Sequence, residues 1–84
     1  MSTVHSLKCW PEYFQAILDG KKSFEVRKDD RGFRAGDILH LQEWSPETQS
    51  YCGRETARLI VYTLTGEDFG IREGFIVMGL EVRK

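Results

Sequence analysis

The stretch WPEYFQAILDGKKSFEVR, residues 10–27, contains a helix, the end of that helix and the strand that follows it. Pro11 suits the first turn of a helix, where its missing N–H group costs nothing. Apolar residues recur at helical spacing through residues 13–18, and Gly20 suits the position just past a helix end. Residues 23–27 then alternate as a strand does. The stretch predicts a helix that begins at Pro11 and a strand over 23–27.

The predicted strand has two chemically different faces. Phe24 and Val26 point to one side, and Glu25 and Arg27 point to the other. Because apolar side chains are normally buried, we expect Phe24 and Val26 in the core and the charged pair on the opposite face.

The remainder of the chain is typical of short strands separated by polar turns. Strands are predicted over residues 4–9, 38–44, 55–66 and 75–83, with a polar hairpin loop over 45–54. In the second of these strands, either Leu39 and Leu41 or Ile38 and Trp44 face the core. We therefore expect a mainly β (α+β) fold of about five mostly antiparallel strands, arranged as a small β-barrel or as a strongly bent sheet, with one short helix closing its cleft.

Length and charge limit the classes of function. A chain of 84 residues makes one domain, residues 1–84, and its net charge of −1 leaves any nucleic-acid affinity to a local patch. Six of the twelve Lys and Arg residues fall within 20–36: Lys21, Lys22, Arg27, Lys28, Arg31 and Arg34. This segment is either a binding patch or a solvated strand and turn.

The sequence carries no sign of a membrane segment, a metal or a cofactor. No secretory signal is visible, and no apolar run approaches the roughly 20 residues that span a bilayer, so a cytoplasmic location is expected. Cys9 and Cys52 are then expected to be free thiols. These cysteines, with His5 and His40, lack the close ligand spacing of a zinc site.

One motif, Gly20-x-Lys22-x-x-Glu25-x-Arg27, places a cation, a hydrogen-bond acceptor and a guanidinium group close together. Such a group suits a base edge or a phosphate. The alternative is an ion pair on a solvated sheet face, which contributes at most about 1 kcal/mol.

This motif after a short helix, followed by a Gly36-Asp37 turn into a strand, resembles the ASCH domain of the PUA-like superfamily, in particular a bacterial and phage subgroup of unknown function. The resemblance extends to YCGR and to the terminal FIVMGL. It implies a PUA-like barrel whose cleft binds RNA and is lined by Lys22, Glu25 and Arg27. Three further ligand-binding candidates follow from placement and charge: His5, Lys8 and Arg54.

Some ASCH relatives are similar to acetylcytidine amidohydrolases, which have Lys at the position of Lys22 and Thr at the position of Glu25, with a distant Glu. Here Glu25 replaces the Thr, and residues 66–74 are too few to carry the third residue. If the protein is an enzyme, Glu25 acts as a base on water while Lys22 stabilises an oxyanion. The sequence favours the absence of catalysis.

Four aromatic residues have two interpretations each. They either stack on bases or serve the fold, as a helix staple or as core. These residues are Trp10, Tyr13, Trp44 and Tyr51.

The predicted function of the protein is that of a module that binds RNA, a nucleotide or a nucleoside. A nucleoside-processing hydrolase and a protein-interaction module are the alternatives. The oligomeric state stays open.

Overall fold

The computed structural model describes residues 2–82 as five strands, one α-helix and one 3-10 helix. In chain order these are β1 (Val4–Cys9), α1 (Pro11–Leu18), β2 (Phe24–Lys28), β3 (Ile38–Ser45), β4 (Ser50–Leu64), η1 (Glu67–Phe69) and β5 (Phe75–Leu80). The helix begins at Pro11, as predicted, and Gly20 adopts a positive φ of 77° just beyond its end. Only glycine takes this conformation at little cost.

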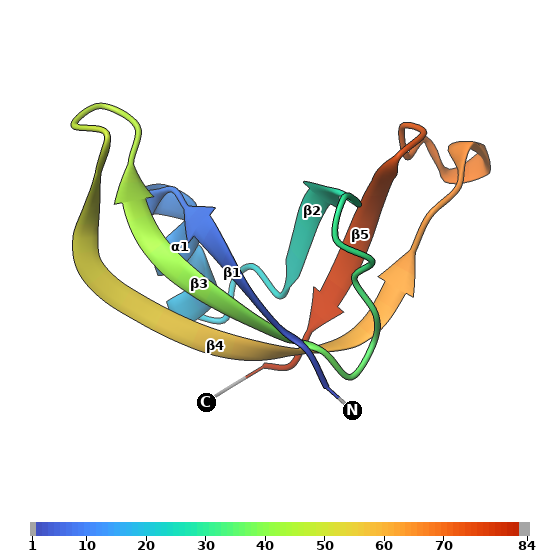
Figure 1. Ribbon diagram of the computed structural model, residues 1–84, viewed down its shortest axis with the longest axis horizontal. Coiled ribbons are helices and arrows are strands. Elements are labelled where there is room, and N and C mark those ends of the chain that lie inside the picture. The colour runs from blue at the N-terminus through green and yellow to red at the C-terminus, as the bar shows by residue number, and fades with distance from the viewer. Residues whose placement is uncertain (1, 83–84) are drawn as a thin grey trace.

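The strands form one mixed sheet in the order β1-β3-β4-β5-β2. β1 and β3 are parallel, and the other three pairings are antiparallel. β4 is long because its first part pairs with β3 and its last part pairs with β5. The sheet bends along β4 into a trough, with β1 and β3 in one arm and β5 and β2 in the other (Figure 1).

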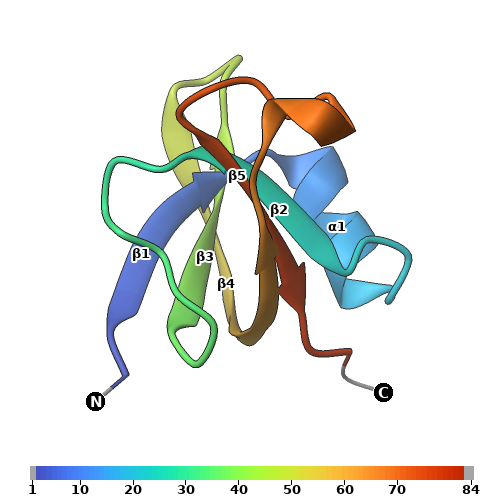
Figure 2. The same cartoon turned by 90° about the vertical axis from the view of Figure 1, so that its right-hand side faces the viewer.

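Of the two predicted architectures, the structure has the bent sheet, and the small barrel is wrong, because β1 and β2 are the two edges of an open sheet. Side chains join these edges where a closed barrel would have a backbone ladder. Arg27 Nη2 donates to the carbonyl of Lys8 at 2.6 Å, and Arg31 Nη1 donates to the carbonyl of Ser6 at 2.8 Å. Figure 2, which looks at the second arm from outside, shows β1 and β2 as separate edges. Strand alternation does not reveal whether the two edges of a sheet meet.

The core lies where the inner faces of the strands meet α1. Leu39 and Leu41 are fully buried, so the first of the two predicted orientations of β3 is confirmed. Phe14 and Ile17 form the buried stripe of α1, which packs against β3. The complete buried apolar set is Leu7, Cys9, Phe14, Ile17, Phe33, Leu39, Leu41, Ile60, Ile76, Met78 and Leu80.

The prediction that Phe24 and Val26 lie in the core is wrong. Their side chains are 44% and 51% exposed, whereas Glu25 is only 4% exposed. The alternation of β2 is as predicted, but the charged face is the inner one. It can be buried because Lys22 and Arg27 both pair with the Glu25 carboxylate, and a paired charge avoids most of the cost of burial.

The predicted loop over residues 45–54 is largely strand. β3 continues to Ser45 and β4 begins at Ser50, so the turn contains only residues 46–49. Residues 50–55 are all exposed. This end of the hairpin extends beyond the core, so its strands carry polar residues on both faces. Arg54 consequently lies on a strand.

Candidate functional site

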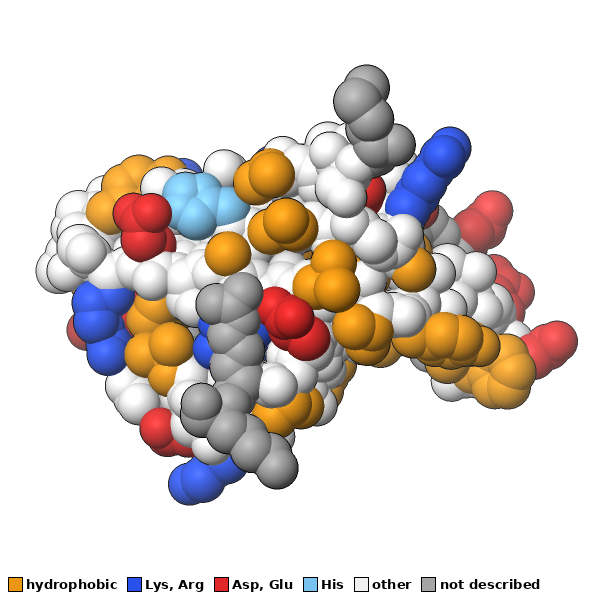
Figure 3. All heavy atoms as spheres, turned by 90° about the horizontal axis from the view of Figure 1, so that it is seen from below, with side chains coloured by type: hydrophobic (Ala, Val, Ile, Leu, Met, Phe, Trp, Pro, Cys, Tyr) orange, Lys and Arg blue, Asp and Glu red, His pale blue; other side chains and the backbone are white. Residues whose placement is uncertain are grey.

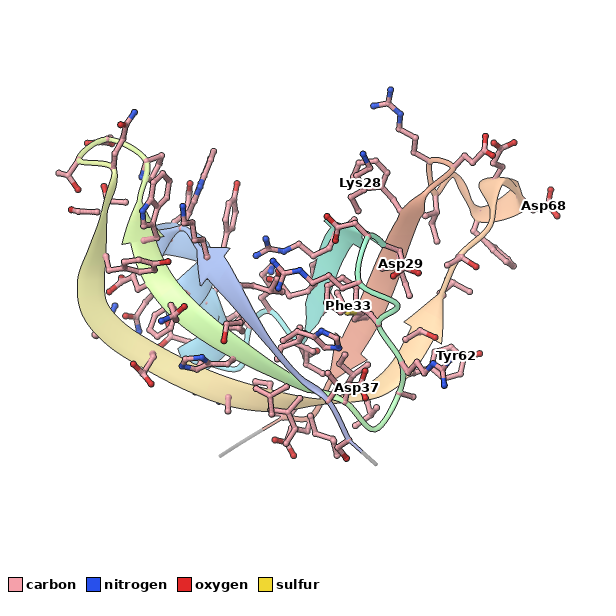
Figure 4. All side chains as sticks on the ribbon, in the orientation of Figure 1. Lys28, Asp29, Phe33, Asp37, Tyr62 and Asp68 are labelled. Atoms are coloured by element: carbon pink, nitrogen blue, oxygen red, sulfur yellow. The ribbon has the colours of Figure 1, made fainter. Side chains whose placement is uncertain are left out.

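A cleft of about 400 Å³ lies between the start of α1 and strand β2. Its lining combines aromatic, charged and thiol side chains: Cys9, Trp10, Tyr13, Lys22, Phe24, Glu25, Val26 and Arg27. Figure 4 shows side chains from both arms reaching into the trough, with Phe33 and Asp37 toward its base. The structure therefore brings the three motif residues, Lys22, Glu25 and Arg27, together in one cleft.

Glu25 is the centre of the charged cluster. Lys22 Nζ donates to Glu25 Oε1, and Arg27 Nε donates to Glu25 Oε2 at 2.9 Å. Lys22 reaches the carboxylate from the loop before β2, and Arg27 reaches it from two residues along the same strand face. Each oxygen keeps a lone-pair direction that these two donors do not use. The cluster can therefore accept a hydrogen bond from a ligand while its net charge stays positive.

Aromatic side chains form the outer part of the cleft. The rings of Trp10 and Tyr13 lie parallel, with centroids 6.1 Å apart and an interplanar angle of 21°. Both side chains are nearly half exposed. Lys22 Nζ lies 5.7 Å from the centroid of Tyr13 and 5.2 Å from that of Phe24. Planar apolar surface thus borders the charged cluster.

Cys9 lines the cleft at the end of β1 and is 3% exposed. Burial, followed by the nearby Glu25 carboxylate, raises the pKa of its thiol to about 11, although Lys22 and Arg27 partly oppose this rise. The thiolate is the reactive form of cysteine. Neither Cys9 nor the exposed Cys52 forms a disulfide.

The two thiols should differ sharply in reactivity. At pH 7.5 a pKa of about 11 leaves about one Cys9 thiol in three thousand ionised. Iodoacetamide should therefore modify only Cys52 in the native protein and both cysteines in denaturant. Intact-mass and peptide-mass spectrometry measure this, and rapid native modification of Cys9 would contradict the burial described here.

Lys8 and Arg54, two of the predicted ligand-binding residues, do not line the cleft. Arg54 donates to both carboxylate oxygens of Glu43 at 3.0 Å, and its guanidinium lies 5.1 Å from the ring of Phe14. The hydrogen bonds between Arg54 and Glu43 lower the pKa of Glu43 and raise the pKa of Arg54. Lys8 Nζ lies 4.6 Å from the ring of Trp44, and only the Lys8 carbonyl is bonded to Arg27.

His5, the remaining candidate, is buried beside Asp37 and away from the cleft lining. The Asp37 carboxylate accepts from His5 Nε2 at 2.9 Å, from the Thr3 N–H at 3.1 Å and from the Arg34 N–H at 3.3 Å. The His5 bond, followed by the Thr3 bond, lowers the pKa of Asp37. His5 and Asp37 thus join β1 to the turn before β3.

The lowered pKa of Asp37 predicts a pH dependence of stability. The unfolded carboxyl binds protons more readily than the folded one, so this stabilisation is present above the unfolded pKa of about 4. It should be lost as pH falls through the lower folded pKa. The difference in unfolding free energy between wild type and Asp37→Asn, measured in urea, should therefore shrink below about pH 4. A difference that stays constant down to pH 2 would contradict this assignment.

The sequence did not identify Cys9, Phe24 or Val26 as cleft residues. Cys9 resembles any buried strand residue, and the two others were assigned to the core. Residues 2–82 contain no cluster of three or more His, Cys, Asp or Glu side chains placed to hold a metal ion. Within the same residues, no helix is long and apolar enough to cross a bilayer.

Comparison with known proteins corrects the predicted resemblance. Residues 4–80 match the family described as a domain of unknown function (DUF3850), so the assignment to the ASCH domain is wrong. A relative in Escherichia phage P2, described as an uncharacterized 12.9 kDa protein in the GpA 3' region, is 46% identical over 44 residues. That alignment covers 52% of this chain and only 40% of the phage protein. With nearly its whole length matched, the chain belongs to the DUF3850 family.

Proposed function

We propose that the protein binds an unpaired nucleoside, either within single-stranded RNA or as a free nucleoside or nucleotide, in the cleft between α1 and β2. The observation that carries this proposal is the buried Glu25 carboxylate, held by Lys22 and Arg27, beside the exposed rings of Trp10 and Tyr13. A nucleobase combines a planar stacking surface with hydrogen-bonding groups on its rim.

The charges favour a base over a bare phosphate inside the cleft. A carboxylate repels phosphate oxygens but accepts hydrogen bonds from the amino group of a base. Stacking of a base on an aromatic side chain adds about 1–3 kcal/mol. Phosphates would instead meet the exposed cations outside the cleft lining, among them Lys21 and Arg34.

Catalysis has less support than binding. A hydrolase that uses a covalent intermediate needs an ionised nucleophile, and the thiol in the cleft has a pKa raised to about 11. Both oxygens of Glu25 already accept hydrogen bonds from cations. A binding module is therefore the proposed function.

The test is a titration of labelled homopolymeric RNA oligonucleotides at several salt concentrations, followed by fluorescence anisotropy. Lys22→Ala and Glu25→Gln should weaken binding by about 1–3 kcal/mol and reduce discrimination between bases. Arg34→Ala, a matched cation outside the cleft, should weaken binding to all bases alike. With two or three phosphate contacts, log affinity should fall against log salt with a slope of about −1.5 to −2.

Two results would contradict binding of RNA in this cleft. If the wild-type protein binds none of the oligonucleotides at low salt, the cleft does not bind RNA. If the cleft variants behave like Arg34→Ala, binding occurs on the charged surface and the cleft has no role.

A protein-interaction module is the second candidate, and the exposed apolar surface favours it. Figure 3 shows a band of apolar side chains across the underside of the molecule. Val61 and Tyr62 on β4 are 52% and 68% exposed, and Phe69 in η1 is 70% exposed. Exposed apolar patches often mark interaction sites. A partner bound here should be lost with Tyr62→Ser and retained with Lys22→Ala.

A further inference from the structure

The cleft follows the free edge of β2. This strand pairs with β5 on one side, and no strand within residues 2–82 pairs with its other side. Phe24, Glu25, Val26 and Arg27 all line the cleft, although they are consecutive. Because side chains alternate between the faces of a sheet, consecutive residues can line one cleft only where it runs along the strand edge.

The register shows which backbone groups this edge presents. The Leu80 N–H donates to the Ser23 carbonyl at 2.9 Å, and the Asp29 N–H donates to the Gly74 carbonyl at 2.8 Å. Residues that exchange hydrogen bonds with an antiparallel neighbour alternate with residues that do not. The N–H and C=O groups of Phe24 and Val26 therefore point away from β5 and into the cleft.

The two edges of the sheet differ in how their backbone groups are satisfied. On β1, the carbonyls of Ser6 and Lys8 accept hydrogen bonds from Arg31 and Arg27. On β2, the hydrogen bonds found within residues 2–82 give the Val26 N–H and C=O no protein partner. Val26 thus offers a donor and an acceptor side by side in the cleft that Glu25 also lines.

We infer that the Val26 backbone reads the base of the ligand. The preferred bases are those whose Watson–Crick edge has an amino group beside a ring nitrogen that carries no hydrogen, which are cytosine and adenine. The Val26 N–H donates to the ring nitrogen, and its C=O accepts from the amino group, as a neighbouring strand would bond here. A free lone pair of Glu25 accepts the second amino hydrogen. This inference rests on the proposed function, and it restricts the ligand to bases whose Watson–Crick edge is free.

A proline substitution isolates the backbone donor. Val26→Pro removes the N–H group without removing a bond of the β2–β5 ladder, and edge strands tolerate proline. Lys28→Pro is the matched control, because Lys28 also alternates away from β5 but does not line the cleft. Amide exchange and circular dichroism would verify that both variants keep the fold.

Isothermal titration with four nucleosides, cytidine, uridine, adenosine and inosine, provides the readout. Wild type should prefer cytidine over uridine, and adenosine over inosine, by about 10-fold, because a carbonyl replaces the amino group in the weaker ligand. Val26→Pro should bind cytidine about 10-fold more weakly than wild type, and Lys28→Pro should stay within about twofold.

A ligand series keeps the test decisive if Val26→Pro does not fold. N4,N4-dimethylcytidine has no amino hydrogen, whereas 2′-O-methylcytidine carries its methyl group on the sugar and keeps both amino hydrogens. Wild type should bind only the second with an affinity close to that of cytidine. The inference is overturned if wild type binds cytidine while folded Val26→Pro or the dimethyl ligand shows no loss. Absence of all nucleoside binding would overturn the proposed function itself.

Discussion

Replacing Phe14 with alanine should lower the free energy of unfolding by about 3–5 kcal/mol. The Phe14 side chain is fully buried and lies on the face of α1 that packs on β3. Its ring centroid lies 5.1 Å from the guanidinium carbon of Arg54. A domain of this size has a total stability of roughly 4–13 kcal/mol. The loss is therefore a large share of the total stability, and urea denaturation followed by circular dichroism measures the change.

Tyr13→Ala is the matched control for this prediction. Tyr13 is the adjacent residue on the same helix and is 46% exposed, so its loss should cost no more than about 1 kcal/mol. Phe14→Leu should retain most of the stability, because it keeps most of the buried volume. Equal losses for Phe14→Ala and Tyr13→Ala would mean that Phe14 does not anchor the helix.

Replacing Glu25 with alanine should have the second largest effect, a loss of about 2–4 kcal/mol. The substitution leaves Lys22 and Arg27 close together without their shared carboxylate. The loss stays below that of a fully buried ion pair, because the Lys22 and Arg27 side chains are 18% and 29% exposed and water screens them in part. Urea denaturation at neutral pH measures the change.

Glu55→Ala provides the comparison for Glu25→Ala. Glu55 is also a strand residue in an ion pair, with His40 at 2.9 Å, but its side chain is 65% exposed. Its removal should change stability by less than about 0.5 kcal/mol. If both variants lost the same stability, the carboxylate of Glu25 would contribute no more than an ordinary surface charge.

The sequence predicted the local structure better than the way in which the strands meet. The helix from Pro11 to the turn at Gly20 depends on neighbours in the sequence, so its bounds could be predicted. The orientation of β2 could not, because burial of Glu25 depends on two cations whose convergence is a tertiary contact. Barrel closure likewise depends on a contact between β1 and β2, which strand patterns do not report.

The candidate site was predicted in part. The spacing of Lys22, Glu25 and Arg27 predicted that they converge, since all three lie within six residues around one strand. His5 and Arg54 were selected for charge and placement alone. Each has a partner distant in the sequence, Asp37 and Glu43 respectively, and only the folded chain shows that these partners hold them away from the cleft.

The hydrogen bonds that Arg27 on β2 and Arg31 in the following loop donate to β1 contribute to the width of the trough. In a closed barrel, the spacing of neighbouring strands is held at about 4.8 Å by the backbone ladder. Here the distance between the two edges depends on the reach of Arg27 and Arg31. The two arms also share one buried core, with Leu39 and Leu41 of β3 in the same cluster as Ile76 and Met78 of β5. The width of the opening between the two edges thus depends on side-chain reach, so substitution of Arg27 or Arg31 should change that width without removing a rung of the sheet.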